Sequence, residues 1–348
     1  MKIVQVMASS GGIGGLEQHT FNLVNELAQN NEVHIITHPC YASNFDSRVT
    51  FHPVDFSRSR FNPMLIWQLK KIIRQIQPDI IHTQAGKAAE LISKIRLNSN
   101  TALVSTVHGT KKSKQPYLSA DAIIVVSKAL AEGLPLDKVE VIYNGILPHH
   151  TLNSLVKQKL YEDITAQHPY LNTDLPLLIC IGRLEPVKNI SLLLNAIKDI
   201  SANLLIVGDG SQRKILEQKA KHLAIDQQVA FLGFRTDARD LIQLSDIVVM
   251  SSDREGFPLV MVEALQAQKP MISTRVNGVT EWIPNDYLAP IGDEKSLHRI
   301  INSSLQQDIA KDFLPLFIRA QHELTVTAMT QKTEDVYRKV LNQSKSSH

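Results

Sequence analysis

The sequence predicts an α/β protein of two doubly wound domains facing a cleft, each a parallel β-sheet covered by helices on both faces. Short runs of β-branched and aliphatic residues alternate with amphipathic segments along most of the 348 residues. This alternation is typical of parallel sheets whose strands are joined by helices. A polar stretch from 151 to 175 interrupts it, and the chain is long for one hydrophobic core. The interruption therefore indicates a linker between two domains.

The first domain is expected over residues 1–150. Helical periodicity runs from Leu16 to Gln29 and from Leu65 to Gln77, and Pro78 ends the second helix because proline lacks the backbone N–H that a helix needs. Strands are predicted at the short apolar runs Lys2–Met7, Val33–Thr37, Ile80–His82, Ala102–Val107, Ala122–Val126 and Val139–Tyr143. Strands and helices in this order predict a Rossmann-like domain.

The second Rossmann-like domain is expected over residues 176–329, where the alternation starts again. Its strands are predicted at Leu177–Ile181, Asn203–Val207, Val229–Leu232, Ile247–Met250 and Met271–Ser273. Its helices are predicted at Ile190–Ile200, Ser211–Leu223, Ala238–Leu244, Leu259–Ala267 and after Asp293, with a C-terminal helix at Thr330–Leu341. Open α/β sheets bind ligands beyond the carboxyl ends of their strands, so functional residues are expected in the loops after strands.

Composition and charge narrow the class of protein. The chain is 43% hydrophobic and 20% charged, with a net charge of +3, which is too mild to indicate nucleic-acid binding. Residues 1–150 hold 15 Lys and Arg against 11 Asp and Glu. Lys111, Lys112 and Lys114 form the densest basic run, which is either a solvated loop or a contact with an anionic surface or acceptor.

The two cysteines and the N-terminus indicate a cytoplasmic protein. Cys40 and Cys180 each end an apolar run, so buried, reduced thiols are expected rather than a disulfide. No signal peptide and no membrane span are expected. Peripheral contact with the cytoplasmic face of the inner membrane stays an alternative.

The strongest motif runs from Glu255 to Glu263, after a predicted buried strand. Pro258 favours the start of a helix at this position, and a helix start offers free N–H groups to a pyrophosphate. Gly256 permits close approach of the backbone to a ligand. The segment expected to contact this ligand also contains Phe257, Leu259 and Val260. Glu255 is placed to accept from sugar hydroxyls and Glu263 from a ribose.

A second motif, Gly182 to Asn189, also follows a predicted strand. Its two cations, Arg183 and Lys188, can neutralise a diphosphate whose negative charge grows as it leaves in a transition state. Gly208 lies in the turn after the next strand, where it is either a ligand contact or only a turn.

Two weaker features lie in the first domain. Gly11, Gly12, Gly14 and Gly15 form a turn after the first strand, but they lack the full dinucleotide-binding spacing and no acid follows the second strand. His108 ends a buried strand and is expected to hydrogen-bond a donor sugar. The 13 histidines include no H-E-x-x-H motif, so no metal is expected. Trp67 and Trp282 are interpreted as packing residues.

These residues, in this order and spacing, resemble glycosyltransferase family four, whose members have the GT-B fold and include bacterial enzymes of lipopolysaccharide core and capsule assembly. The resemblance rests on Gly14-Gly15-Leu16-Glu17, His108, Gly182-Arg183, Lys188-Asn189, Gly208-Asp209-Gly210, Phe231-Leu232-Gly233 and Glu255 with Glu263. It covers nearly the whole chain and is most specific in the second half.

The resemblance implies a retaining, metal-independent hexosyltransferase without a cofactor. Its donor would be UDP- or GDP-linked, and its acceptor a saccharide or lipid-linked saccharide of lipopolysaccharide, lipooligosaccharide or capsule. Arg183 and Lys188 would bind the diphosphate, Glu263 the ribose and Glu255 the hexose. His108 would contact the hexose near the reacting carbon, the loop at Gly14 and Gly15 would close over the phosphates, and Glu17 would lie on the acceptor side. The C-terminal segment 330–348 would join the first domain.

One departure from the family pattern is Gln268, at the position where glycine usually ends the helix after Glu263. If this position has a positive φ, glutamine there costs on the order of 1 kcal/mol. It does not touch the expected chemistry.

Two other functions stay open at this point. A sugar-nucleotide epimerase of the same architecture would use the same diphosphate contacts, with His108 and Glu17 as its candidate acid and base. A dinucleotide-dependent oxidoreductase rests on the glycine-rich turn alone.

Overall fold

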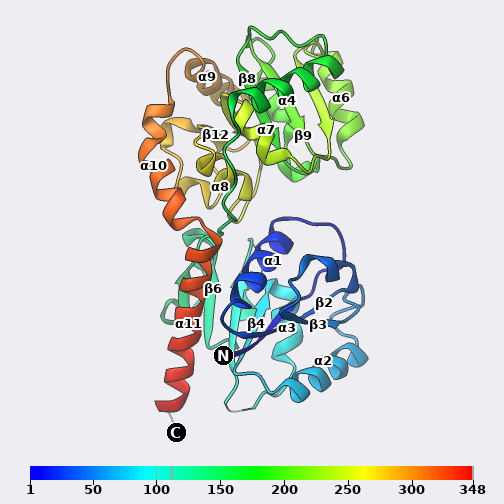
Figure 1. Cartoon of the computed structure of the whole chain (residues 1–348), viewed down its shortest axis with the longest axis vertical. Coiled ribbons are helices and arrows are strands. Elements are labelled where there is room, and N and C mark those ends of the chain that lie inside the picture. Colours follow the sequence, from blue (N-terminus) through cyan, green and yellow to red (C-terminus); the bar gives the residue numbers. More distant parts are fainter. Residues whose placement is uncertain (99, 111–112, 347–348) are drawn as a thin grey trace. The chain divides into compact units, whose positions relative to one another are not determined.

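The computed structural model describes residues 1–98, 100–110 and 113–346. The chain forms two compact units (Figure 1). Unit 1 contains Met1–Leu147 together with the C-terminal segment that starts at Glu323, and unit 2 contains Pro148–His322. In the part of the chain that is described, no helix is long and apolar enough to cross a bilayer.

Unit 1 contains a parallel sheet with the strand order β3-β2-β1-β4-β5-β6-β7. The strands are β1 (Lys2–Met7), β2 (Glu32–Thr37), β3 (Val49–Pro53), β4 (Ile80–Gln84), β5 (Ala102–Val107), β6 (Ala122–Val125) and β7 (Val139–Val141). The helices of this unit are α1 (Gly15–Leu27), α2 (Pro63–Ile76), α3 (Ala85–Ser93) and α11 (Val326–Ser346).

Unit 2 contains a second parallel sheet, with the order β10-β9-β8-β11-β12-β13. Its strands are β8 (Leu177–Ile181), β9 (Asn203–Val207), β10 (Val229–Gly233), β11 (Ile247–Met250), β12 (Met271–Thr274) and β13 (Leu288–Ala289). Its helices are α4 (Ser154–Gln167), α5 (Ile190–Ala196), α6 (Arg213–His222), α7 (Ala238–Leu244), α8 (Leu259–Gln266), α9 (Glu294–Ser304) and α10 (Ala310–Glu323).

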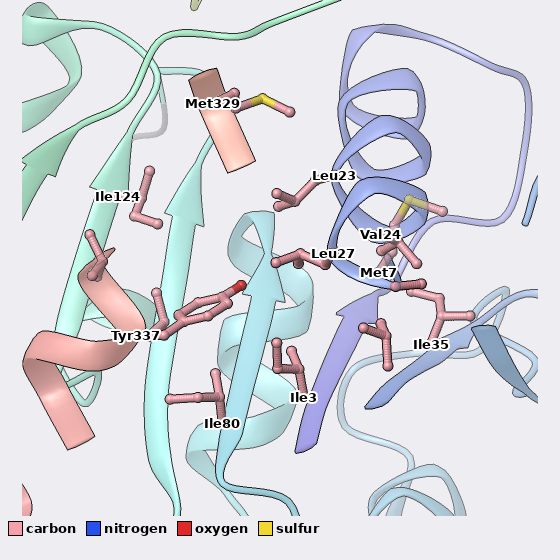
Figure 2. Packing of buried hydrophobic residues seen from close by; sticks show 14 of the residues in the cluster. Ile3, Met7, Leu23, Val24, Leu27, Ile35, Ile80, Ile124, Met329 and Tyr337 are labelled. Carbon is pink, nitrogen blue, oxygen red and sulfur yellow. The ribbon is translucent and has the colours of Figure 1, made fainter. Parts of the chain in front are cut away.

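One core cluster of unit 1 lies between the sheet and two helices that are far apart in sequence. Ile3 and Met7 of β1 contact Leu23 and Leu27 of α1, and Tyr337 of α11 lies in the same cluster (Figure 2). Side chains of a strand alternate between its two faces, so Gln5, between Ile3 and Met7, faces the same helices. Gln5 belongs to a network of buried, hydrogen-bonded polar side chains in unit 1.

The boundaries between the units correct those expected from the sequence. Residues 151–175 were expected to be a linker, but they contain α4 and belong to unit 2, which begins at Pro148 rather than at 176. Within α4 only Ile164 is buried, so its sequence lacks the apolar face that marks a packed helix. Asn153 nevertheless caps the helix by accepting from the backbone N–H of Val156.

Two single-residue expectations also need correction. Trp67 was interpreted as a packing residue, but its side chain is 62% exposed, whereas Trp282 is buried. Cys40 is exposed, while Cys180 is buried and burial raises the pKa of its thiol to about 12. Both thiols are free.

Gln268 has a φ of 56°, in the left-handed region that favours glycine. We therefore expect Gln268→Gly to raise the free energy of unfolding by about 0.5–1 kcal/mol in urea denaturation. The matched control is Gln218→Gly, the same substitution on the exposed side of α6 in the same unit. It should lower that free energy by about 0.5–1 kcal/mol, since glycine weakens a helix interior. Two losses of similar size would contradict this interpretation.

Candidate functional site

In both sheets the strand order reverses beside the first strand of the unit, between β1 and β4 and between β8 and β11. The helices that follow two such strands diverge to opposite faces of the sheet, which leaves a crevice where ligands bind. In unit 2 the loops at this point are 182–189, after β8, and 251–258, after β11. These are the two loops that carry the strongest sequence motifs.

Lys188 and Glu255 meet at this crossover of unit 2. The Lys188 Nζ donates to Glu255 Oε1 at 2.6 Å, and the two side chains are only 21% and 13% exposed. The structure therefore brings together the expected diphosphate cation and the expected hexose carboxylate. In this state each neutralises the other.

Further hydrogen bonds hold the two loops together around this pair. Asn189 donates from Nδ2 to Asp253 Oδ1 at 2.8 Å. The Asp253 N–H donates to the Val187 carbonyl, and the Ser251 hydroxyl donates to the Lys188 carbonyl. The position of Lys188 is therefore fixed by backbone contacts as well as by its own charge.

The segment Gly256–Val260 forms the start of α8, as the motif predicted. Pro258 is extended and immediately precedes Leu259, the first residue of the helix. Phe257 is buried, and Gly278 packs so closely that a Cβ there would lie 2.6 Å from the Gly256 carbonyl oxygen. Close packing against Gly278 therefore holds this turn in place.

Glu263 lies in the second turn of α8. Burial raises the pKa of its carboxyl above the ordinary value, and the charge of Arg239 opposes this shift. A carboxylate in such surroundings gains from accepting hydroxyl hydrogen bonds, because these replace the water that it has lost.

Gly208 has a structural reason to be glycine. Its φ is 131°, and a Cβ at this position would overlap the Gly182 carbonyl oxygen. The Leu184 N–H donates to the Asp209 carbonyl at 2.9 Å. The loops after β8 and β9 therefore lie backbone to backbone, and Gly208 supports the loop that carries Lys188. Arg183, in the same loop, is exposed to solvent.

The glycine-rich turn of unit 1 is tied down by Tyr41. The Tyr41 hydroxyl accepts from the Gly11 N–H and lies within hydrogen-bond distance of the Gly11 and Gly12 carbonyls. Gly14 precedes α1 as its N-cap, and Gly15 is the first residue of that helix.

Glu17 has a structural role that the sequence did not reveal. One carboxylate oxygen accepts from the Gly14 N–H at 3.0 Å, and the other accepts from the Ser9 hydroxyl. Glu17 therefore caps α1, and both of its oxygens are engaged.

His108 follows β5 and begins a chain of hydrogen bonds through unit 1. Its Nε2 lies 2.7 Å from Gln84 Oε1, and Gln84 donates from Nε2 to Gln5 Oε1 at 2.9 Å. Gln5 in turn donates from Nε2 to the hydroxyl of Tyr337 at 2.9 Å. The chain thus runs from the end of β5 to the C-terminal helix α11.

The directions of these bonds fix the tautomer of His108. An amide oxygen can only accept, so His108 must carry its proton on Nε2. Burial lowers the pKa of His108 well below its ordinary value, and His19 and His82 add to this. The ring is therefore neutral near pH 7, and its Nδ1 is a hydrogen-bond acceptor.

The chain ends on a second buried histidine. Because the Tyr337 hydroxyl accepts from Gln5, its own proton is available for His82 Nδ1, which lies 2.6 Å away. His82 Nε2 then donates to the Thr106 hydroxyl at 2.6 Å. Burial lowers the pKa of His82 to about 3, so this ring is neutral too.

His19 is a candidate residue that no sequence pattern indicates. Its ring lies edge-on to His108, with 4.6 Å between the ring centroids, and its Nδ1 lies 2.9 Å from Asn144 Oδ1. Burial lowers the pKa of His19 to about 4. The Nε2 atom is buried and has no hydrogen-bond partner in the described structure. No local spacing links positions 19 and 108, so only the fold reveals the pair.

One group of side chains in unit 2 has metal-ligand chemistry. The ligand atoms of His149, His150 and Asp240 lie within 4.8 Å of one another. His149 Nε2 lies 2.7 Å from Asp240 Oδ1, and Gln243 donates to the His150 carbonyl at 2.9 Å. These contacts attach the beginning of unit 2 to α7, a structural role that requires no ion.

Two family models match the chain. The model described as "Glycosyltransferase Family 4" matches residues 13–149, and the one described as "Glycosyl transferases group 1" matches residues 163–313. The first match includes Gly14, Glu17 and His108. The second includes Lys188 and Glu255.

Relatives and solved structures agree with these matches. N-acetyl-alpha-D-glucosaminyl L-malate synthase of Bacillus anthracis is 24% identical, over 89% of this chain and 93% of that protein. The lipopolysaccharide core biosynthesis glycosyltransferase LpsD of Rhizobium meliloti is 24% identical, over 81% of this chain and 80% of its own. The structure of Anabaena HepE in complex with UDP-glucose has a TM-score of 0.79 at 21% identity, covering 100% of both chains. This likeness shows that the chain has the GT-B fold.

The hydrogen-bond chain of unit 1 predicts an effect of removing one hydroxyl. Tyr337→Phe removes the buried hydroxyl that accepts from Gln5 Nε2 and donates to His82 Nδ1, and leaves these two atoms only their mutual contact at 3.3 Å. We therefore expect it to lower the free energy of unfolding by about 1–3 kcal/mol. Tyr117→Phe is the matched control, because Tyr117 is also buried and no described residue hydrogen-bonds its hydroxyl. It should change the free energy by less than about 0.5 kcal/mol. Histidine ring NMR should show His108 protonated on Nε2, and a proton on Nδ1 would contradict the chain.

Proposed function

The chain belongs to the glycosyltransferases that these two family models describe, and we propose that it is a retaining hexosyltransferase with a UDP- or GDP-linked donor. Its acceptor is a saccharide. The observation that carries this proposal is the ion pair between Lys188 and Glu255 at the crossover of unit 2, beside the start of α8. The pair supplies a cation for a diphosphate and a carboxylate for a sugar within one rigid pair of loops.

Donor binding exchanges the partners of this pair. A diphosphate is a stronger partner for Lys188 than one carboxylate, and Arg183 lies in the same loop to add a second cation. Release from Lys188 frees the Glu255 carboxylate to accept from hexose hydroxyls. Glu263 accepts from the ribose, and the N–H groups at the start of α8 face the phosphates. Each charged group of the site therefore has a partner on the bound donor.

The same groups promote bond cleavage. The acceptor oxygen forms a bond to the anomeric carbon, and the bond from that carbon to the phosphate oxygen breaks. The nucleoside diphosphate leaves with the electron pair, and the acceptor proton passes to its phosphate. Lys188, Arg183 and the α8 start stabilise the charge that develops on the leaving group, the task that a metal ion has in other enzymes. Attack from the face of the departing phosphate retains the anomeric configuration.

His108 suits a positioning role for the hexose. Its ring is neutral, and its Nδ1 accepts a hydrogen bond from a sugar hydroxyl. The fixed tautomer means that the acceptor atom is present before the donor binds, without reorganisation. The loop at Gly14 and Gly15 is proposed to cover the phosphates.

The structure gives less support to the alternative function, a sugar-nucleotide epimerase. Such an enzyme needs an acid and a base at a sugar carbon, and the candidates were His108 and Glu17. The carboxylate of Glu17 caps α1, and the pKa of His108 is far below neutral. Neither group is therefore suited to exchange protons near pH 7.

The acceptor is proposed to belong to lipopolysaccharide, lipooligosaccharide or capsule. LpsD, by its name, acts in lipopolysaccharide core synthesis, whereas the Bacillus anthracis relative is named for L-malate. The basic run Lys111, Lys112 and Lys114 was interpreted either as a solvated loop or as a contact with an anionic surface or acceptor. The first two lie outside the described residues, and Lys114 donates to the Leu130 carbonyl at 3.0 Å.

The donor site is tested by measuring the binding of the diphosphate and the transfer of the hexose separately. UDP and GDP, each with EDTA, should be screened by thermal shift against the wild type, Lys188→Gln and Glu255→Gln. We expect one diphosphate to stabilise the wild type and Glu255→Gln by about 2–3 kcal/mol near 100 times its Kd, and to stabilise Lys188→Gln much less. Transfer of the hexose should fall at least about 100-fold in both variants. Lys214→Gln, on the exposed side of α6, is the matched control.

Full transfer activity in both site variants would reject the proposed site. Conversion of a nucleotide sugar without an acceptor would favour the epimerase. The anomeric configuration of the product, read by NMR, tests retention separately from the site.

A further inference from the structure

Helix α2 presents large apolar side chains to solvent. Phe61 precedes the helix and is 73% exposed, while Met64 and Trp67 within it are 64% and 62% exposed. Leu65, Leu69 and Ile73 on the opposite side are buried in unit 1. Single exposed apolar residues are common on protein surfaces, but three within seven positions on one surface mark an interaction site.

The same surface is basic. Lys71 and Arg74 continue the exposed stripe of Met64 and Trp67 at helical spacing. Lys71 Nζ lies 5.5 Å from the ring centroid of Trp67, and Lys94 Nζ, from the end of α3, lies 4.5 Å from that of Phe61. No acidic residue in the described structure forms an ion pair with Lys71 or Arg74. We call Phe61, Met64, Trp67, Lys71 and Arg74 the α2 face (Figure 1 shows the helix).

The nearby acids do not cancel this charge. Asp55 pairs with Arg58, and Glu90 pairs with both Arg60 and Lys94. Two acids thus neutralise part of a group of three cations, and the cations of the α2 face remain in excess. The surface therefore attracts anions at long range.

We propose that the α2 face binds the surface of an anionic lipid bilayer. The apolar side chains of the face, Phe61, Met64 and Trp67, can enter the boundary between headgroups and acyl chains. The cations Lys71 and Arg74 extend to the lipid phosphates. Trp67 is of the residue type that prefers this boundary. A second copy of the chain does not fit, because the face would meet its own positive charge.

This inference goes beyond glycosyl transfer and does not rest on it. The α2 face binds lipid whether or not a donor is present. If both proposals hold, the face brings the enzyme to the membrane surface where a lipid-linked saccharide acceptor is anchored.

Trp67 allows a direct test with the full chain. The sequence contains two tryptophans, and Trp282 is only 3% exposed, so a change in emission on binding reports on Trp67. Vesicles of phosphatidylglycerol and phosphatidylcholine should sediment the protein, shift its emission to the blue and protect it from acrylamide. Pure phosphatidylcholine vesicles should bind at least about tenfold more weakly, and added salt should release the protein.

Two variants separate the apolar and the basic contributions. Met64→Ser with Trp67→Ser, and Lys71→Glu with Arg74→Glu, should each reduce vesicle binding at least about tenfold. The matched controls are Phe234→Ser, at another exposed ring, and Lys214→Glu, at another exposed cation, which should bind as the wild type does. All of these variants should keep the thermal stabilisation by nucleoside diphosphate, so failure here is distinguishable from failure of the proposed function.

Three results would overturn the inference. One is the absence of sedimentation with anionic vesicles. Another is sedimentation that leaves Trp67 fully accessible to acrylamide, which would place the contact elsewhere. The third is binding to soluble polyglutamate without vesicle binding, which would indicate an acidic protein partner.

Discussion

The reversal of strand order beside β8 is the constraint on which the proposed donor site depends. It makes β8 and β11 neighbours although they are about seventy residues apart in the chain. Their following loops therefore converge, and Lys188 meets Glu255 at 2.6 Å. The loops can approach only because Gly208 leaves room for the Gly182 carbonyl, and Gly278 leaves room for Gly256. The ion pair, the backbone contacts between the loops and the positions of the two glycines all depend on this reversal of strand order.

Unit 1 differs in that it buries several polar side chains, which need hydrogen bonds within the protein. Gln5, His82, Gln84 and Thr106 lie on neighbouring strands of one sheet, where unpaired polar groups would be costly. Their hydrogen bonds have one consistent direction from His108 to Thr106, and α11 completes them through Tyr337. A fully satisfied chain of this kind specifies one tautomer for each ring. The C-terminal helix thus contributes chemistry as well as apolar contacts to unit 1.

Sequence patterns predicted the parts of this structure that are locally encoded. The strand Lys2–Met7 and the start of α8 after Pro258 could both be read from neighbouring residues. Patterns failed where the determinant is distant or atypical. Strand β3 was missed because Val49–Pro53 is not a continuous apolar run, and helix α3 because it contains Gly86 in its first turn. Helix α10 was missed because it contains Pro315. The partners of Gln5 and His19 lie 332 and 125 residues away, so no spacing could predict them.

The most direct test of the donor site is a crystal structure of the complex with the nucleoside diphosphate that stabilises the protein. We predict a phosphate oxygen within hydrogen-bond distance of Lys188 Nζ, a ribose hydroxyl on Glu263, and Glu255 separated from Lys188. A nucleotide bound elsewhere, with the bond between Lys188 and Glu255 intact, would contradict it.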